Sequence, residues 1–466
     1  MAYTTINNGK IYFNTKLYTG NGSTQSITGV GFQPDWVWLK DRTNANSSRI
    51  NDIVRGATKY LISSTTGAEA TESAGLTSFN SDGFSLGSNS DFNGNSANFA
   101  SWNWIGAGTA PSKTYTVKVV SDGGNKYRFD DFGTSAVTLE ISEGGTYTFD
   151  QADSSNSGHP IRFSTTSDGS HGGGSEYTTG VTTNGTPGNA GAYTRITVAA
   201  SAPTLYYYCT AHSGMGGQAN TPTTNSFSNF AGTIQSNISP NTTSGFSIVS
   251  YTGNGTSGAT VGHGLSSKPG MMIFKERNGA TGWVVYQHKN TSAPATEYLQ
   301  LNTTAATADY AGYFNDTEPT SSVFTLGNDT GINQNNDTYI AYCFSEVKGY
   351  SKFGSYGGNQ NANGVFVYLG FKPAFLMIKR SSTGNPSATN WQMFDSKRLG
   401  YNVDNNQLQA NLSNAEGTDD DLDILSNGFK LRGTGGDLNH SGHTYIYMAF
   451  AENPFTSSTG TPVTAR

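Results

Sequence analysis

The chain has 466 residues, a formal net charge of −6, 34% hydrophobic residues and 13% charged residues. Its 25 tyrosines and 25 phenylalanines exclude a simple disordered chain, which would be poor in aromatic residues. The negative charge gives no general attraction to nucleic acid or to an anionic membrane, so we expect neither as a partner. No apolar run approaches the roughly 20 residues that span a bilayer, and residues 1–10 lack the apolar core of a signal peptide. We therefore expect neither membrane insertion nor export by a signal peptide.

Short aromatic runs among many Thr, Ser, Asn and Gly residues predict an all-β protein. Residues 1–16 are predicted to be an N-terminal arm or docking strand. A proline-led run then follows at residues 31–42, GFQPDWVWLKDR. Proline has no backbone donor, so it starts a strand rather than sitting inside one. Similar runs recur at residues 264–277 and 370–380, which predicts an internal repeat.

Each copy of the repeat begins with a tyrosine before a Gly/Asn turn and ends on an aromatic strand; the opening residues are Tyr18, Tyr251 and Tyr356. The last two copies are offset by about 105 residues, which is too long for a solenoid unit but suits a whole β-sandwich. We predict three lectin-like or jelly-roll β-sandwiches, each burying its own core. Their predicted bounds are residues 17–110, 244–347 and 348–456, with a C-terminal tail at 457–466.

The first two copies are offset by about 128 residues more than this period, so a further domain is inserted between them. An alternating strand pattern at residues 115–120 opens it, and we place the insert at residues 113–217. The Thr/Asn/Ser-rich stretch at residues 218–243 is predicted to be a linker. Cys209 and Cys343 fall in different predicted domains, so no structural disulfide is expected and the redox compartment stays undetermined.

The insert holds the sharpest chemical pattern of the chain, YYYCTAHSGMG at residues 206–216. We expect a strand to end at Cys209 and a tight glycine-containing loop to return His212 and Met215 to the same point. His159, at the end of an earlier strand, would complete the site. One thiolate, two imidazoles and one thioether are the ligand set of a blue-copper centre.

This stretch resembles the cupredoxins, over about residues 113–217. The resemblance implies a Greek-key β-sandwich with copper ligands His159, Cys209, His212 and Met215. The alternative is a cupredoxin-shaped module whose site is reduced, empty or merely structural. We expect His171, in a glycine-rich segment, to be a loop residue and not a ligand.

Outside the insert, four tryptophans are candidates for stacking on sugars, although a place in the core is commoner for this residue type: Trp36, Trp38, Trp283 and Trp391. The proline-led strands end in paired cations, which we expect to hold a carboxylate of the same repeat or to face a partner subunit: Lys40 with Arg42, Lys275 with Arg277, and Lys379 with Arg380.

Glu69 and Glu416 occupy equivalent positions in the first and third copies, but Thr307 stands there in the second. A glycosidase needs a pair of carboxylates, and this pattern does not supply one in every copy. We expect a turn or cap role for both glutamates, and no enzymatic activity.

Three phrases carry a resemblance over about residues 12–106 and 238–456: GFQPDWVWLK at 31–40, GYSKFGSY at 349–356 and YIYMAFAENPF at 445–455. They resemble a repeat family of virion structural proteins of tailed phages, especially phages of marine bacteria. This implies a non-enzymatic particle component assembled in the host cytoplasm: a fibre, spike, tail-associated or capsid decoration protein. The expected partners are other virion proteins, a host-surface glycan and further copies of the chain, with a trimer favoured. The rival hypotheses are a copper-binding redox protein and a carbohydrate-active enzyme.

Overall fold

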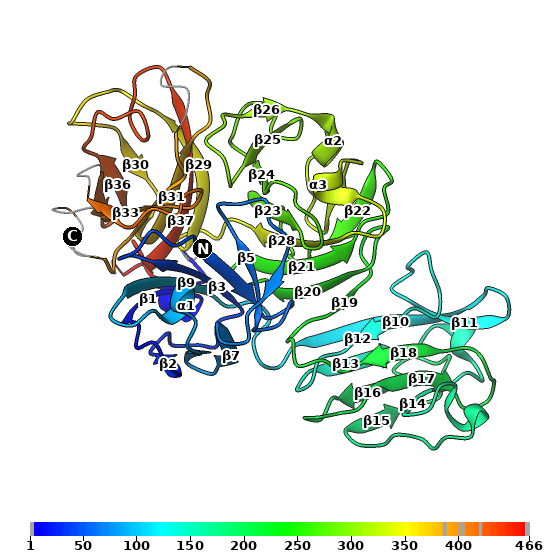
Figure 1. Ribbon diagram of the computed structural model, residues 1–466. Coiled ribbons are helices and arrows are strands. Elements are labelled where there is room, and N and C mark those ends of the chain that lie inside the picture. The colour runs from blue at the N-terminus through cyan, green and yellow to red at the C-terminus, as the bar shows by residue number, and fades with distance from the viewer. Residues whose placement is uncertain (1–3, 385–388, 399–401, 403–405, 419–421, 462–466) are drawn as a thin grey trace. The chain divides into compact units, whose positions relative to one another are not determined.

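The computed structural model describes residues 4–384, 389–398, 402, 406–418 and 422–461 (Figure 1). Nearly all regular structure is strand, which confirms the all-β prediction. Among these residues, no helix has the length and apolarity to cross a membrane. The chain forms two compact units: unit 1 comprises Met1–Gly106, Pro240–Ala259 and Leu265–Arg466, and unit 2 comprises Ala107–Ser239 and Thr260–Gly264.

Unit 1 contains three large antiparallel sheets with the same strand order, one in each predicted repeat. The first is β1 (Phe13–Thr19), β9 (Asn98–Trp104), β3 (Trp36–Asp41), β4 (Arg49–Asp52), β5 (Lys59–Ile62) and β6 (Ala70–Thr71). The second is part of an eight-stranded sheet, and its corresponding strands are β21 (Phe246–Thr252), β28 (Thr338–Phe344), β23 (Met271–Glu276), β24 (Val284–Gln287), β25 (Glu297–Gln300) and β26 (Ala308–Asp309). The third is β29 (Ser351–Gly357), β37 (Thr444–Pro454), β31 (Phe371–Arg380), β32 (Gln392–Asp395), β33 (Asn406–Gln409) and β34 (Gly417–Thr418).

Smaller elements accompany these sheets. In the first repeat they are β2 (Gln25–Thr28), β8 (Gly83–Leu86), β7 (Leu76–Asn80) and α1 (Ser90–Asn93), with η1 (Gly9–Ile11) before β1. In the second they are β22 (Ala259–Gly262), β27 (Val323–Leu326), α2 (Ala311–Phe314) and α3 (Thr330–Asn333). In the third they are β30 (Phe366–Tyr368), β36 (Gly428–Leu431) and β35 (Leu422–Leu425).

Strand β3 is buried along its whole length because both faces of its sheet are covered. Val37 and Leu39 pack with Phe84 of the small sheet. The alternate residues, Trp36 and Trp38, point into a second core. A strand that is buried on both faces reads as a continuous apolar run, which accounts for the uninterrupted pattern after Pro34.

This second core is common to all three repeats. Trp36 of the first lies 4.6 Å, centroid to centroid, from Tyr342 of the second, and Phe344 of the second lies 5.8 Å from Phe450 of the third. The expectation that each sandwich buries a core of its own is therefore wrong for one face of each large sheet. An isolated repeat would leave that aromatic face in water, and packing the three faces together removes it.

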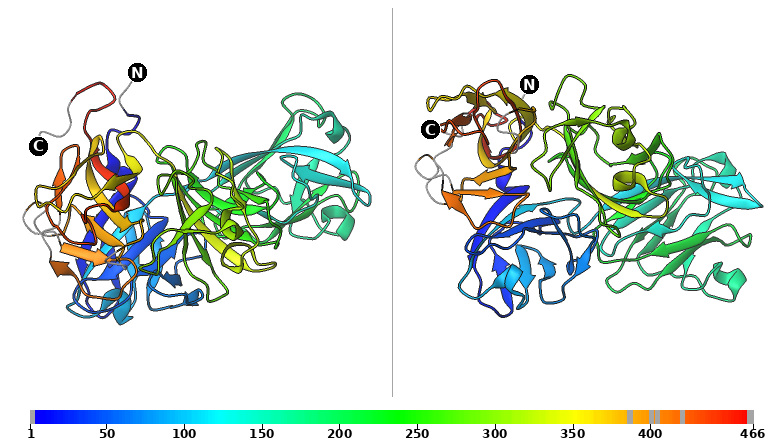
Figure 2. Two further views of the ribbon diagram at one scale, coloured as in Figure 1. Left: turned by 90° about the horizontal axis from the view of Figure 1, so that it is seen from above. Right: turned by 45° about the horizontal axis from the view of Figure 1, so that its top comes forward.

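The predicted N-terminal arm partly belongs to the first sheet, because β1 already begins at Phe13. The Phe13 ring lies 4.7 Å from Trp104 and 5.6 Å from Phe450 of β37. Figures 1 and 2 show the blue β1 beside the red β37, near opposite ends of the chain. Residues 1–3 of the arm and 462–466 of the predicted tail lie outside the described residues.

Unit 2 is a sandwich of two sheets. One is β11 (Asn125–Phe129), β10 (Ser112–Ser121), β13 (Thr146–Asp150), β16 (Tyr193–Thr197) and β15 (Val181–Asn184); the other is β12 (Leu139–Glu140), β18 (Gly217–Asn220), β17 (Leu205–Cys209) and β14 (Ile161–Ser164). The pairs β10/β13 and β12/β18 are parallel. Aromatic residues join the sheets: Phe129 lies 5.2 Å from Tyr207, and Phe149 lies 5.4 Å from Phe163. The short helices η2 (Ser154–Asn156) and η3 (Gly169–Gly172) lie in its loops.

The stretch at residues 218–243 is not a linker but part of the folded protein. It contains β19 (Phe227–Asn229) and β20 (Ser236–Asn241), which pair antiparallel. Phe230 packs 5.7 Å from Tyr115. The polar composition suggested a flexible segment, but a few aromatic residues are enough to anchor it in the core. Unit 2 consequently extends beyond the predicted 113–217 at both ends.

Candidate metal centre

The candidate ligands meet at one end of the β14/β17 pair. Cys209 is the last residue of β17, and it pairs in register with Ile161, the first residue of β14. His159 therefore lies two residues before the strand that flanks the cysteine. His212 follows on the loop that joins β17 to β18. The strand register thus brings together residues that lie far apart in the sequence.

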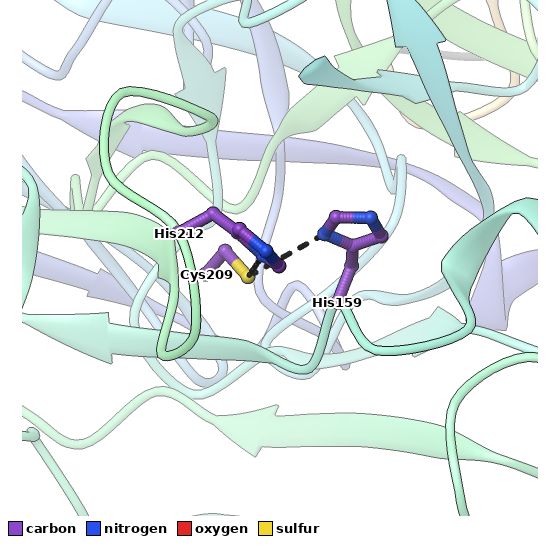
Figure 3. A group of neighbouring side chains, drawn as sticks. All are labelled: His159, Cys209 and His212. Atoms are coloured by element: carbon purple, nitrogen blue, oxygen red, sulfur yellow. Dashed lines mark hydrogen bonds between the residues drawn. The ribbon is translucent and has the colours of Figure 1, made fainter.

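The three polar side chains converge (Figure 3). The Cys209 sulfur lies 3.9 Å from Nδ1 of His159 and 3.8 Å from Nδ1 of His212. One ligand atom from each residue lies within 4.8 Å of the others. The cysteine is buried, His159 is half-buried and His212 is exposed, so the group faces solvent on the His212 side.

These residues fit a single metal ion. An ion held at about 2.0–2.3 Å from each atom requires sulfur–nitrogen separations of the size observed. Burial, together with the neighbouring His212, lowers the pKa of His159, which favours the neutral imidazole that a metal needs. A thiolate with two imidazoles suits copper or zinc, and a thioether as a further ligand would favour copper.

Met215 lies on the same loop and is only 1% exposed. Its carbonyl accepts a 3.0 Å hydrogen bond from the amide of Tyr127. The return of this loop needs glycine at position 216, because a Cβ atom there would lie 1.7 Å from the carbonyl oxygen of Tyr207. The glycine after the methionine therefore sets how closely the ligand loop approaches β17.

A set of residues outside the predicted ligands holds the ligands in place. Gln151 Nε2 and the Tyr127 hydroxyl donate to the carbonyl oxygen of His159, at 2.8 and 2.9 Å. Burial raises the pKa of Tyr127, and the neighbouring Cys209 thiol raises it further, so the phenol stays protonated. Such partners orient ligands and tune a metal site. Sequence reasoning missed them because neither residue lies in the ligand motif.

His171 is not a member of the converging group. It is exposed, on η3, and its Nε2 lies 3.0 Å from the carbonyl oxygen of Cys209. The amide of Gly214 donates to Asp168 Oδ1 at 2.8 Å, just before η3. The loop at residues 168–171 therefore braces the ligand loop, in line with the expectation that His171 is no ligand.

Residues 8–124 and 219–454 match a family model described as a domain of unknown function, DUF7483. The chain belongs to this family. No curated protein matches the chain, and no solved structure matches it either. His159, Cys209 and His212 lie in the interval between the two DUF7483 segments, so the candidate metal centre is not part of what the family model describes.

The four tryptophans proposed for sugar stacking lie in the DUF7483 segments and are 0–1% exposed. None of them can present a ring face to a ligand in this fold, so they are core residues. Two of them also join repeats: Trp283 Nε1 donates to the carbonyl oxygen of Ile62 at 2.9 Å, and Trp391 Nε1 donates to that of Gln300 at 3.0 Å.

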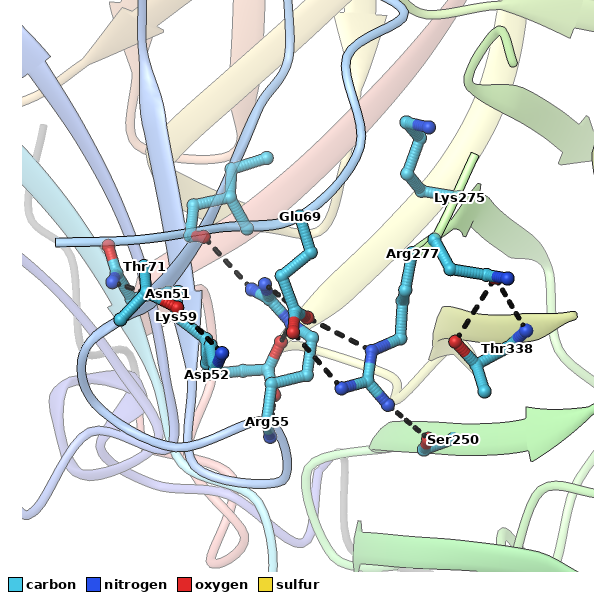
Figure 4. Close-up of polar contacts among 12 residues, drawn as sticks. Asn51, Asp52, Arg55, Lys59, Glu69, Thr71, Ser250, Lys275, Arg277 and Thr338 are labelled. Carbon is cyan, nitrogen blue, oxygen red and sulfur yellow. Dashed lines mark hydrogen bonds and ion pairs between the residues drawn. The ribbon is translucent and has the colours of Figure 1, made fainter. Parts of the chain in front are cut away.

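The predicted cations and glutamates of the DUF7483 segments meet across repeats. Arg277 of the second repeat binds Glu69 of the first, with Nε–Oε2 at 2.9 Å (Figure 4). Arg42 of the first binds Glu416 of the third, with Nη2–Oε2 at 2.7 Å. The carboxylate comes from the neighbouring repeat, not the same one, because the end of each proline-led strand reaches the next sheet. The turn or cap role expected for the glutamates is also wrong.

Two further arginines reach the same glutamates from inside their own repeats. Arg55 contacts Glu69 at 3.3 Å, and Arg398 contacts Glu416 at 3.1 Å. Each also pairs with an aspartate three residues earlier. The missed signal was visible in the sequence, since the Asp-x-x-Arg spacing occurs at the same place in the first and third copies: Asp52 with Arg55 and Asp395 with Arg398.

In the part of the chain that the structure describes, the predicted lysines form no ion pair with a carboxylate but donate to backbone carbonyls. Lys40 reaches Asp41 and Ser413 at 3.0 Å, and Lys379 reaches Thr389 at 2.8 Å. Burial lowers the pKa of Lys40 and of Lys275 to about 8, and that of Lys379 to about 7. Each lysine is 0% exposed, so none is available to a partner subunit.

Proposed function

We propose that this chain is a non-enzymatic structural protein of a tailed-phage particle, a fibre, spike or tail-associated protein that contacts the host surface. Capsid decoration is the alternative position. The proposal extends to homo-oligomers, with a trimer favoured, and to assembly in the host cytoplasm. It rests first on the resemblance of the repeat phrases.

The observation that carries the proposal is the closed ring of repeats in unit 1. Equivalent backbone bonds join the second repeat to the first (Glu69 N–H to Arg277 O, 2.7 Å), the first to the third (Glu416 to Arg42, 2.9 Å) and the third to the second (Thr307 to Ser381, 2.9 Å). Identical head-to-tail contacts that close leave no end exposed for further addition. Such a ring with one core is a rigid scaffold.

Glu69, a carboxylate of this ring, is unsuited to act as a general acid. Burial alone would raise the pKa of Glu69, but hydrogen bonds and charge from Arg277 and Arg55 outweigh it and hold the pKa below its ordinary value. A general acid needs a raised pKa. This supports a structural role and weighs against the carbohydrate-active alternative.

The test is to locate the chain in purified particles. A lysate in which the chain is made from its own genome would be fractionated by density, and antibody against the full chain would be used for immunogold labelling. We expect the label on intact particles, on tails or fibres for the leading position and on heads for decoration. Chain that stays with soluble lysate proteins and is absent from particles would overturn the proposal.

The convergence of His159, Cys209 and His212 favours a second candidate function, copper binding by a cupredoxin-like insert. The cysteine sulfur and the two imidazole nitrogens would hold the ion, with Met215 as the weak fourth ligand. Bound copper supplies one-electron redox chemistry. Gln151 and Tyr127 fix the His159 backbone, and the half-buried setting limits access of water.

Copper titration of the full chain tests this candidate. We expect one equivalent to bind with a visible thiolate-to-copper charge-transfer band. Cys209→Ala should abolish the band, whereas Cys343→Ala, which removes the other buried cysteine, should keep it. Binding without the band, or a band that survives Cys209→Ala, would refute a cysteine-ligated copper site.

A further inference from the structure

The third repeat carries exposed aromatic residues where the first repeat has small polar ones. On β30, Phe366 and Tyr368 are 43% and 50% exposed, among the most exposed large hydrophobic residues of the described chain. They lie two apart, so both point to the same face of the strand. Between them Val367 points inward and is 7% exposed.

The internal repeat shows that the fold does not require these two rings. In the first repeat, β2 pairs with β8 as β30 pairs with β36: Ile27 faces Phe84 as Val367 faces Phe429. This register places Ser26 and Thr28 at the positions of Phe366 and Tyr368. Both of these polar residues are exposed. The same sheet therefore forms without aromatic residues on its outer face, and exposed rings that packing does not need mark a binding surface.

Beside Tyr368 lies a hollow of about 410 Å³, which is within the usual size range of ligand sites. Its lining includes Glu346, Lys348 and Lys352 as well as backbone at Gly349 and Gly370. Lys352 Nζ donates to the carbonyl oxygen of Tyr368 at 2.7 Å and lies 5.7 Å from the centre of its ring. This holds a positive charge next to the exposed ring.

The charge of the hollow favours an anion. Two lysines face one carboxylate there, on a chain whose net charge is −6. That carboxylate interacts with Lys352 and is also held by other groups: Glu346 Oε1 accepts from the amide of Phe353 at 2.9 Å and lies 3.5 Å from His288 Nε2.

We propose that this surface binds an acidic saccharide. The C–H face of a sugar ring stacks on Tyr368 and Phe366, and its carboxylate faces Lys348 and Lys352. A protein partner would bury a wider apolar patch than two rings between charged residues provide. The inference deepens the proposed function by naming the class of host-surface ligand, and to that extent it rests on it.

The test measures binding of the full chain to trigalacturonate, sialyllactose and, as a neutral probe, cellotriose. We expect an acidic saccharide to bind with Kd below about 10 mM, more tightly than cellotriose, and more weakly as salt rises. Tyr368→Thr with Phe366→Ser, which copies the first repeat, should weaken binding at least about tenfold. Thr28→Ala on the first repeat is the matched control and should leave binding unchanged.

Several outcomes would overturn the inference: no binding of either acidic saccharide, equal binding of cellotriose, or binding that the double variant retains. A change in sedimentation coefficient caused by the double variant would assign the surface to contact between copies instead. Failure here is distinguishable from failure of the particle role, because immunogold labelling of particles does not depend on saccharide binding.

Discussion

Glu69 illustrates how single residues join the repeats of this protein. Its carboxylate accepts hydrogen bonds from Arg277 of the second repeat and forms an ion pair with Arg55 of the first repeat, to which Glu69 itself belongs. Its side chain is 11% exposed, so the carboxylate is largely removed from solvent. Breaking a buried pair leaves uncompensated charge, which costs more than a surface pair is worth.

We predict that Glu69→Gln lowers the free energy of unfolding by about 2 kcal/mol at pH 7. The pKa of this carboxyl is lowered by folding, so its contribution is complete above the pKa of the unfolded chain and is lost as pH falls through the lower folded pKa. The difference between wild type and variant should therefore shrink below about pH 4. Urea unfolding at a series of pH values measures it.

Glu318→Gln serves as the control, because Glu318 forms an exposed pair with Lys268 and its side chain is 51% exposed. We expect little change in stability at any pH for this variant. A Glu69 effect that is as small as the control, or that does not vary between pH 7 and pH 3, would contradict the role assigned to the inter-repeat ion pair.

The candidate metal ligands were predictable at the level of residues, whereas the residues that support them were not. The spacing of Cys209, His212 and Met215 predicts a compact loop. In the structure, the side chains of Cys209 and His212 lie beside that of His159. Gln151 and Tyr127 act through backbone contacts, which leave no pattern in side-chain type. Tyr127 lies on β11 and Gln151 follows β13, so only the packing of the two sheets of unit 2 brings these residues to the site.

At the scale of elements, the proline-led strands and the turns were readable because both follow local rules. The opening tyrosines bond a short helix or turn in each repeat: the hydroxyl of Tyr18 donates to Phe92 O at 2.6 Å, that of Tyr251 to Ile332 O at 2.7 Å and that of Tyr356 to Leu438 O at 2.8 Å. The Gly/Asn turn that follows each tyrosine is specified by neighbouring residues in the chain.

In each repeat, the residue after the carbonyl that accepts the tyrosine hydrogen bond is an asparagine, and its buried side chain bonds the backbone of the Gly/Asn turn. Asn93 and Asn333 accept from the turn amides of Asn21 and Asn254, at 3.0 and 2.9 Å, and both are 0% exposed. Asn439 does the same in the third repeat. The sequence contains the repeated asparagine, but its role depends on a turn some 70–80 residues away.

The segment at residues 218–243 was misread for a related reason. Composition predicts flexibility when apolar residues are sparse, but Phe227 and Phe230 enter the core of unit 2. Small polar residues then satisfy each other, as when the amide of Ser226 donates to Ser142 Oγ at 2.8 Å. Burial of two aromatic residues offsets the entropy of ordering this segment.

At the scale of unit 1, the three junctions of the ring are chemically unequal. Two of them hold the Asp, Arg and Glu network. The third replaces it with neutral groups: Thr307 Oγ1 donates to Asn290 at 2.7 Å, and Gln287 Nε2 donates to Gly354 O at 3.1 Å. The same geometry is therefore reached with ions or without them.

We predict that the neutral junction can be transplanted onto the junction between the first two repeats. The variant Asp52→Gln, Arg55→Asn, Glu69→Thr, Arg277→Ser removes every charge at once and should stay within about 2 kcal/mol of wild type in urea unfolding. Arg55→Asn alone leaves two carboxylates partly buried and should cost about 3 kcal/mol or more. A quadruple variant less stable than this single variant would show that the ions are essential to the junction.

The sequence by itself determined that the chain is all-β, and from neighbouring residues and period it predicted three copies of one unit, an insert between the first two, and a compact Cys–His–Met loop. It did not reveal that the copies share a core, that Trp36 and its equivalents are buried there, or that arginines of one repeat hold glutamates of another. These contacts join residues up to about 370 positions apart. An aromatic face or an arginine reads the same in a sequence whether its partner is solvent, a ligand or another repeat, and only the packed structure settles which partner it has.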